Sequence, residues 1–123
     1  MNLDLQIVTR GDHKVIEGRP GTQLLRSPDD IVDVIGTYFE HRSNSLLLYA
    51  ENLTDRFFDL SSGDAGAILQ KLRNYHIRIA IVASPDAVKQ STMFGEMVLE
   101  ESKGGDFRIF DDSDSAEMWL TGE

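Results

Sequence analysis

The chain has 123 residues, the usual size of one domain, and 41% of them are apolar, so we expect residues 1–123 to form a single domain with its own core. Without any cysteine it can form no disulfide bond, thiolate metal site or cysteine nucleophile. The formal net charge of −9 disfavours binding to nucleic acid or to an anionic membrane, which are both negatively charged, and favours a protein partner with a basic surface.

The first two expected elements form a β-hairpin. Residues 3–8 and 13–18 are rich in residue types that strands prefer, and the turn formers Gly11 and Asp12 lie between them. The sequence therefore predicts two paired strands joined by a tight turn.

A helix is expected after residue 27. Ser27 is a typical N-cap, Pro28 suits the first helical position, and Asp30 completes a capping-box pattern. Apolar side chains then recur every three or four residues, which places them on one face of a helix. These side chains are Ile31, Val34, Ile35, Tyr38 and Phe39.

Residues 45–50 and 77–83 are continuous apolar runs, as expected of strands that are buried on both faces. The segment between them carries a second helical stripe, and we expect a helix from about Ser62 to Tyr75. Since a right-handed crossover brings its two strands together, we expect these strands to be adjacent, parallel and almost fully buried.

The last part of the chain predicts a helix, a strand and a short acidic helix. Ser91 can cap the first of these helices, residues 107–110 have strand character, and Ser113 can cap the second helix. The complete order, ββαβαβαβα, indicates an α/β fold with a mixed sheet whose centre is parallel.

The longest loop after a predicted central strand has the sequence AENLTDRFFDLSSG and covers residues 50–63. In open α/β sheets, functional sites tend to lie at such carboxyl ends of strands. The adjacent residues Phe57 and Phe58 would point to opposite sides of an extended loop, which would expose one of them as an anchor for a partner. A loop folded over the core would instead hide both.

Residues 45–85 resemble the STAS domain, which sulfate transporters and anti-sigma-factor antagonists share. As in that family, a buried strand leads to an acidic residue, a serine and a glycine, and then to a helix and a second apolar strand. The chain is also similar to a small bacterial family of unknown function with FFDL, AG-x-IL-QK and I-A-IV stretches at these places. The resemblance implies a STAS-like fold and a non-catalytic regulatory module that binds another protein.

In STAS antagonists a partner kinase phosphorylates the serine before the glycine, and dephosphorylation restores binding to the partner. The resemblance therefore implies Ser62 as the phospho-acceptor, with Ser61 one place away, and a kinase or an anti-sigma-like protein as the partner. The expected interaction face surrounds these serines. It comprises Glu51, Asn52, Phe57, Phe58 and Asp59.

The two serines also have a structural interpretation. Ser61 is followed three residues later by Asp64, and this capping pattern contributes about 1 kcal/mol to a helix. A helix N-terminus also tolerates a phosphate, because its first N–H groups are free. A cap and a regulatory switch both remain open as interpretations.

A second class of function would use the same place, since a small-molecule sensor or an enzyme subunit would bind its ligand in the crevice at the strand ends. The three histidines are far apart and no phosphate-binding or hydrolase motif is present, so we expect no metal, no cofactor and no catalytic residue. The sequence shows neither a secretory leader nor a membrane-spanning run, which predicts a cytoplasmic protein, and it leaves a homo-oligomer open.

Overall fold

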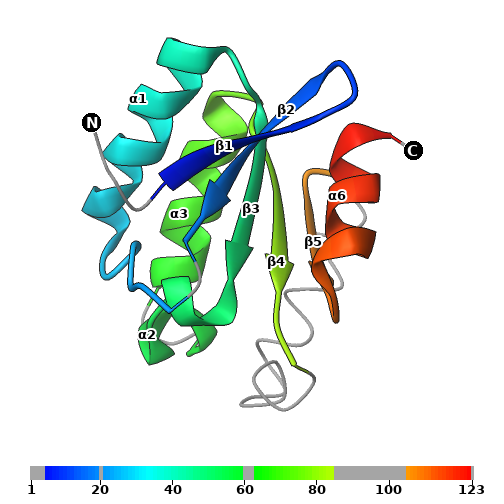
Figure 1. The fold of residues 1–123 in the computed structure, drawn as a ribbon. Helices are drawn as coiled ribbons and strands as arrows, with labels where there is room; N and C mark the ends of the chain where they lie inside the picture. Colours follow the sequence, from blue (N-terminus) through cyan, green and yellow to red (C-terminus); the bar gives the residue numbers. More distant parts are fainter. Residues whose placement is uncertain (1–4, 20, 60–62, 85–104, 123) are drawn as a thin grey trace.

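In the part of the chain that the structure describes, five strands form one mixed sheet in which the order in space is the order in the chain, β1-β2-β3-β4-β5 (Figure 1). The computed structural model describes residues 5–19, 21–59, 63–84 and 105–122. The first pair of strands is antiparallel and the other pairs are parallel, so the predicted α/β fold with a parallel centre is confirmed. The strands are β1 (Leu5–Arg10), β2 (His13–Gly18), β3 (Ser45–Tyr49), β4 (Arg78–Val82) and β5 (Phe107–Phe110).

The predicted hairpin is confirmed, and its turn depends on a glycine. Gly11 has a φ of +62°, a left-handed conformation that glycine adopts without strain. The pairing of β1 with β2 runs from Leu5 opposite Gly18 to Arg10 opposite His13. The hairpin thus places β1 at one edge of the sheet, with β2 linking it to the parallel strands.

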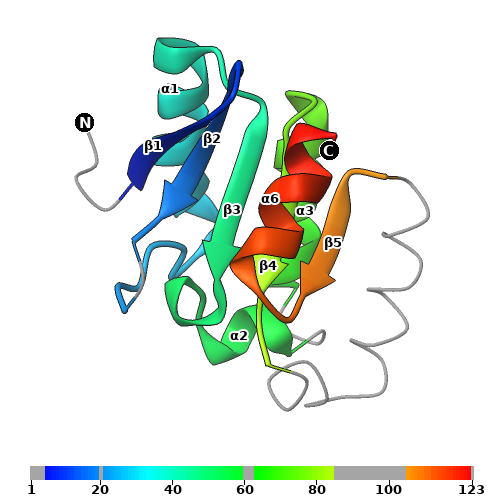
Figure 2. The same cartoon turned by 45° about the vertical axis from the view of Figure 1, so that its right-hand side comes forward.

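Helices cover both faces of the sheet (Figures 1 and 2). α1 (Ile31–His41) and α3 (Asp64–Asn74) pack on one face, and α6 (Ser113–Thr121) packs on the other. Successive strand residues point to opposite faces, so Leu48 lies in the larger core with α1 and α3, whereas Leu47 lies in the smaller core under α6. None of the helices in the described ranges combines the length and the apolar character that a membrane span requires.

The two continuous apolar runs form neighbouring strands, as predicted. β3 and β4 are parallel, in a register that pairs Ser45 with Arg78. Leu47 and Ile81, from the middle of these strands, are both 0% exposed. Covering helices on both faces explain why neither run shows the alternation of a half-exposed strand.

The helix predicted after Ser27 begins as a 3-10 turn, η1 (Pro28–Asp30), and continues as α1. The Asp30 carboxylate accepts the backbone N–H groups of Arg26, at 2.9 Å, and of Ser27, at 3.3 Å. Free N–H groups at this helix start are thereby satisfied, as the capping pattern predicts.

The cap of the last helix lies one residue earlier than predicted. Asp112, rather than Ser113, is the N-cap of α6, and its carboxylate accepts the Ser115 N–H at 2.7 Å. Both residue types cap helices, but a carboxylate also interacts favourably with the positive end of the helix dipole. β5 is a parallel neighbour of β4, and the helix predicted after Ser91 lies outside the described residues.

Candidate functional site

The loop between β3 and α3 lies at the carboxyl ends of the parallel strands, where the sequence predicts a site (Figure 1). It is folded rather than extended, because β3 is followed by a 3-10 turn, η2 (Ala50–Asn52), and a short helix, α2 (Asp55–Phe58). Leu53 also forms an isolated parallel bridge with Leu25, from the loop after β2. Two loops therefore build this end of the molecule together.

Asn52 joins these two loops from inside. Its amide Nδ2 donates to the backbone carbonyls of Arg19, at 2.8 Å, and Thr22, at 2.7 Å, and its Oδ1 accepts the Tyr49 N–H at 2.7 Å. The Asn52 side chain is 0% exposed. Its predicted place on an interaction face is therefore wrong, since every polar group of the amide is directed into the protein.

Gly18, at the end of β2, leaves the space that the Asn52 amide occupies. A Cβ atom at residue 18 would lie 2.5 Å from Asn52 Oδ1 and 2.9 Å from Leu24 Cδ1. Both distances are too short for non-bonded atoms. Glycine at this position is therefore required by the close approach of the amide.

Phe57 is a core residue and not an exposed anchor. It is 1% exposed and lies in the larger core, because α2 folds back over the end of the sheet. Of the two arrangements that the sequence leaves open, the loop folded over the core is the one observed for Phe57. The side chain of Phe58 lies outside the described part of the chain.

The exposed members of the predicted face are Glu51 and Asp59. Glu51 accepts the backbone N–H of Gly21 at 3.2 Å, which links its carboxylate to the neighbouring loop. Ser61 and Ser62 lie outside the described residues, which resume at Gly63. Two acidic side chains at the surface therefore remain from the predicted face among the described residues.

The start of α3 combines a carboxylate with a guanidinium. Gly63 is the N-cap, with a φ of +79°, and Asp64 follows as the first helical residue. The Asp64 side chain is 7% exposed, and its Oδ2 accepts from Arg56 Nε at 3.2 Å. Arg56 thereby offsets the charge of Asp64, which together with the helix dipole makes this end of α3 compatible with a further anion.

A second polar cluster, which the sequence analysis missed, lies on the α6 side of the sheet. Glu17 on β2 is buried and accepts hydrogen bonds from Gln6 Nε2, at 2.6 Å, and from the Tyr49 hydroxyl, at 3.0 Å. Burial raises the pKa of Tyr49 to about 12, and the hydrogen bond and charge of Glu17 add to this shift. The charge of Glu117 raises it slightly as well, whereas a hydrogen bond with Ser113 acts in the opposite direction.

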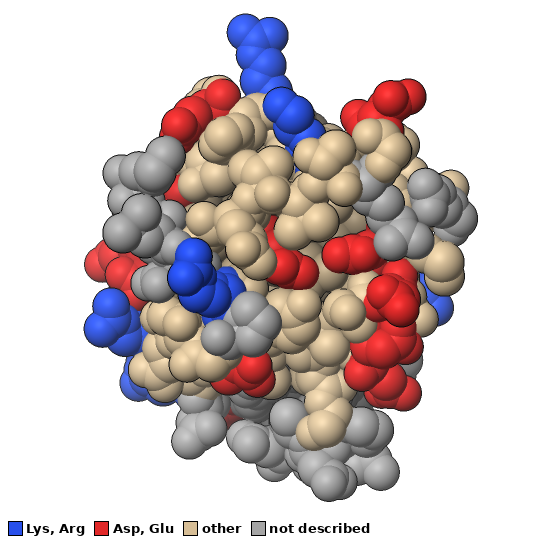
Figure 3. Space-filling model, in the orientation of Figure 1, with Lys and Arg blue, Asp and Glu red and all other residues tan. Residues whose placement is uncertain are grey.

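This face of the molecule is acidic. Figure 3 shows Asp and Glu side chains gathered over the beginning of α6, on the right of the view. The sequence signal for the cluster is weak, because an acidic residue on a strand usually points to solvent. Here the side chain at residue 17 points to the same face as Val15 and is covered.

We expect Tyr49 to ionise only near pH 12. The folded protein binds the phenol proton more tightly than the unfolded chain, in which the pKa of this phenol is about 10. The contribution of Tyr49 to stability is therefore fully present below pH 10 and is lost as the pH rises towards 12. Phenolate absorbance, recorded against pH, should show a late component that disappears in Tyr49→Phe and persists in the control Tyr75→Phe. A late component that survives in Tyr49→Phe would contradict this assignment.

In the described ranges, no three side chains of the metal-binding types come close enough to hold an ion together. The β3–α3 loop and the start of α3 offer features suited to binding. These features are exposed carboxylates, a helix start with a guanidinium and a loop that is held by internal hydrogen bonds.

The family comparison covers almost all of the elements described above. A model of the family described as "Domain of unknown function (DUF4180)" matches residues 10–120. No curated protein and no solved structure matches the chain. Because the matched region extends from the end of β1 to α6, the chain belongs to the DUF4180 family, a domain of unknown function.

Proposed function

We propose that this protein is a non-catalytic regulatory module, similar to the STAS domains of anti-sigma-factor antagonists, which binds a partner protein through the loop between β3 and α3. The observation that carries the proposal is the construction of this loop. Asn52 and Phe57 hold it from inside, while Glu51 and Asp59 remain exposed at the carboxyl end of a central strand. A firmly held loop binds with a smaller loss of conformational entropy.

The order of elements around the loop supports the STAS-like assignment. The buried strand β3 leads through the acid Asp59 and the αL residue Gly63 to the helix α3, and then to the second buried strand β4. This succession is the one on which the resemblance rests. The family match, which carries no function of its own, is compatible with it.

The charge of the loop indicates the chemistry of the partner. Glu51 and Asp59 are exposed carboxylates on a chain with a net charge of −9, so a basic surface would be attracted to this face. Complementary charge mainly raises the association rate and selects against acidic partners. A regulatory protein with a basic binding face is therefore the expected partner.

A phosphate in the segment 60–62 would change this face directly. It adds a charge of about −1.5 to −2 next to the N-terminus of α3, where the positive end of the helix dipole and a guanidinium favour an anion. The guanidinium is that of Arg56, which already contacts Asp64. Phosphorylation at Ser62 or Ser61 would then draw Arg56 and the start of α3 towards the phosphate, and a loop reorganised in this way would no longer fit the partner.

The test combines partner capture with matched variants. A photo-crosslinking residue at position 51 is used to capture the partner in cells of the natural host, and the purified partner is titrated against variants. We expect Glu51→Lys and Asp59→Lys to weaken binding about tenfold, chiefly through the association rate, while the control Asp12→Lys at the other end of the sheet binds normally. We expect Ser62→Asp to weaken binding, and Ser62→Ala to bind constitutively.

Two outcomes would overturn parts of the proposal. Unchanged affinity in Glu51→Lys and Asp59→Lys would remove the loop from the interface. Unchanged affinity in both Ser62 variants, with no phosphorylated peptide from residues 60–62 in protein isolated from its host, would leave the serines as caps. Melting temperatures of all variants separate these effects from a loss of folding.

A further inference from the structure

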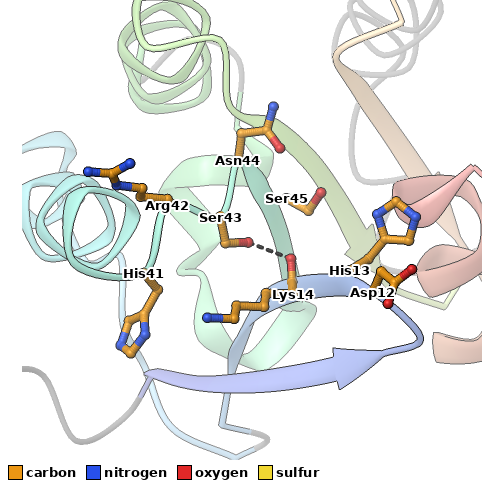
Figure 4. Close-up of a pocket in the computed structure, with 8 residues that line it drawn as sticks. All are labelled: Asp12, His13, Lys14, His41, Arg42, Ser43, Asn44 and Ser45. Carbon is orange, nitrogen blue, oxygen red and sulfur yellow. Dashed lines mark hydrogen bonds between the residues drawn. The ribbon is translucent and has the colours of Figure 1, made fainter.

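The end of the sheet opposite the β3–α3 loop carries two adjoining cavities. One, of about 300 Å³, is polar and has the side chains of Lys14, Ser43 and Ser45 in its lining (Figure 4). The other, of about 490 Å³, is lined by the aromatic residues Tyr38 and Phe39. Arg42 and Asn44 line both cavities, so the two cavities are neighbours.

The polar cavity is built where α1 passes directly into β3. Arg42 ends α1 in a left-handed conformation, with a φ of +55°, and its N–H donates to the Tyr38 carbonyl at 2.7 Å. The Ser43 hydroxyl donates to the Lys14 carbonyl at 2.5 Å, which joins this turn to β2. Ser43 and Ser45 are both buried, so the floor of the cavity is held in place.

The rim of the polar cavity is cationic although the protein as a whole is acidic. Lys14 and Arg42 are exposed, and neither has a carboxylate partner among the described residues. In the view of Figure 4, Lys14, Arg42 and His41 lie on one side of the two serines, with the Arg42 guanidinium directed away from them, and His13 lies on the other side. Asp12 is the acidic residue of this lining. Two cations without a carboxylate partner among the described residues are suited to an oxyanion.

The second cavity offers aromatic surface next to the same arginine. Tyr38, Phe39 and Tyr75 contact one another edge to face, with ring centroids 5.1–6.5 Å apart. Phe39 is 63% exposed, an unusual exposure for a large apolar side chain. Its ring is therefore open to a planar group, and the amide of Asn44 can hydrogen-bond to the edge of such a group.

We propose that these adjoining cavities bind a small ligand in which a planar aromatic ring carries an anionic group. The ring lies against Phe39 and Tyr38, the anion is held by Lys14 and Arg42, and Asn44 contacts polar atoms of the ring. The two volumes fall within the range of small-molecule sites. A second copy of the chain fits less well, because a twofold contact through this face would bring the unpaired cations of the two copies together.

Adenosine monophosphate is a suitable probe, because adenosine lacks the anion and ribose 5-phosphate lacks the ring. Titration calorimetry of the full chain should show binding of adenosine monophosphate, with both partial probes weaker by about tenfold or more. Lys14→Gln and Arg42→Gln should reduce the affinity for adenosine monophosphate to about that for adenosine. Phe39→Ala should reduce it to about that for ribose 5-phosphate.

Matched controls distinguish this site from general effects of charge and surface. Arg26→Gln removes an exposed arginine away from the cavities, and Val32→Ala shortens another exposed apolar residue of α1, so neither should change the affinity. Equal affinities for adenosine monophosphate and adenosine, insensitivity to Lys14→Gln and Arg42→Gln, or no binding at millimolar concentration would overturn the proposal. Self-association that Phe39→Ala abolishes would assign the aromatic surface to a second copy and overturn it too. None of these measurements involves the β3–α3 loop, so their outcome is independent of whether that loop binds a partner.

Discussion

Replacing Asn52 with alanine is expected to lower the free energy of unfolding by about 3 kcal/mol, since it removes the three hydrogen bonds of a buried amide, worth about 1 kcal/mol each. The change leaves the Tyr49 N–H and the carbonyls of Arg19 and Thr22 without their partners in the interior. Both loops at the carboxyl end of the sheet depend on this one amide. Chemical denaturation in urea measures the effect.

Two further variants at this position make the result specific. Asn52→Asp keeps the shape and the acceptor for Tyr49, but it places a carboxylate against two carbonyl oxygens, so it should destabilise at least as much as alanine. The exposed neighbour Glu51 makes one bond, to the Gly21 N–H at 3.2 Å, and Glu51→Ala should change stability by about 0.5 kcal/mol or less. Similar stabilities for Asn52→Ala and Glu51→Ala would contradict the described role of the amide.

Replacing Phe57 with alanine is expected to destabilise the protein by about 3–5 kcal/mol, the usual range for a phenylalanine lost from a core. The ring is 1% exposed and is the contact through which α2 reaches the larger core. Its removal leaves a cavity under the β3–α3 loop. Thermal and urea unfolding would report the loss, with a matching decrease in melting temperature.

Phe39 is the matched control for Phe57, because it is the same residue type on the outside of α1 and is 63% exposed. Phe39→Ala should cost about 1 kcal/mol or less, mainly from the lost ring contacts with Tyr38 and Tyr75. Comparable losses in the two variants would show that α2 does not hold Phe57 in the core. The same comparison matters for partner binding, since weaker binding by Phe57→Ala would reflect a damaged loop and not a lost contact.

The strands and their partners were predictable from the sequence because burial on both faces leaves a strong pattern. The runs around Leu47 and Ile81 contain no alternation, and that feature alone indicates central, parallel strands. The cap of α6 was missed by one residue, since Asp112 and Ser113 are neighbouring residues that both cap helices. Local patterns thus identify elements well and their first residues less well.

The place of the β3–α3 loop at the carboxyl end of a central strand was predictable from the sequence, but its internal contacts were not. An asparagine after a strand is typical of an exposed turn, and nothing local indicates that the partners of Asn52 are Arg19 and Thr22, about thirty positions earlier. The contact between Tyr49 and Glu17 likewise joins different strands. The polar cavity at the amino ends of the parallel strands was not predicted for the same reason, because the β1–β2 hairpin and the α1–β3 turn form it together. All of these contacts join residues that are far apart in the chain, and a local sequence pattern does not show which of them come together.

The strand order also bears on how the protein forms as it is synthesised. Each strand pairs with the strand before it in the chain, so the sheet can grow in the order in which the chain leaves the ribosome. The β1–β2 hairpin needs only a local turn, and β3, β4 and β5 then join at the same advancing edge. None of the five described strands has to insert between two that are already paired. The nascent sheet therefore has one edge that advances, and the next strand to emerge covers it, which limits the exposure of open strand edges to other chains.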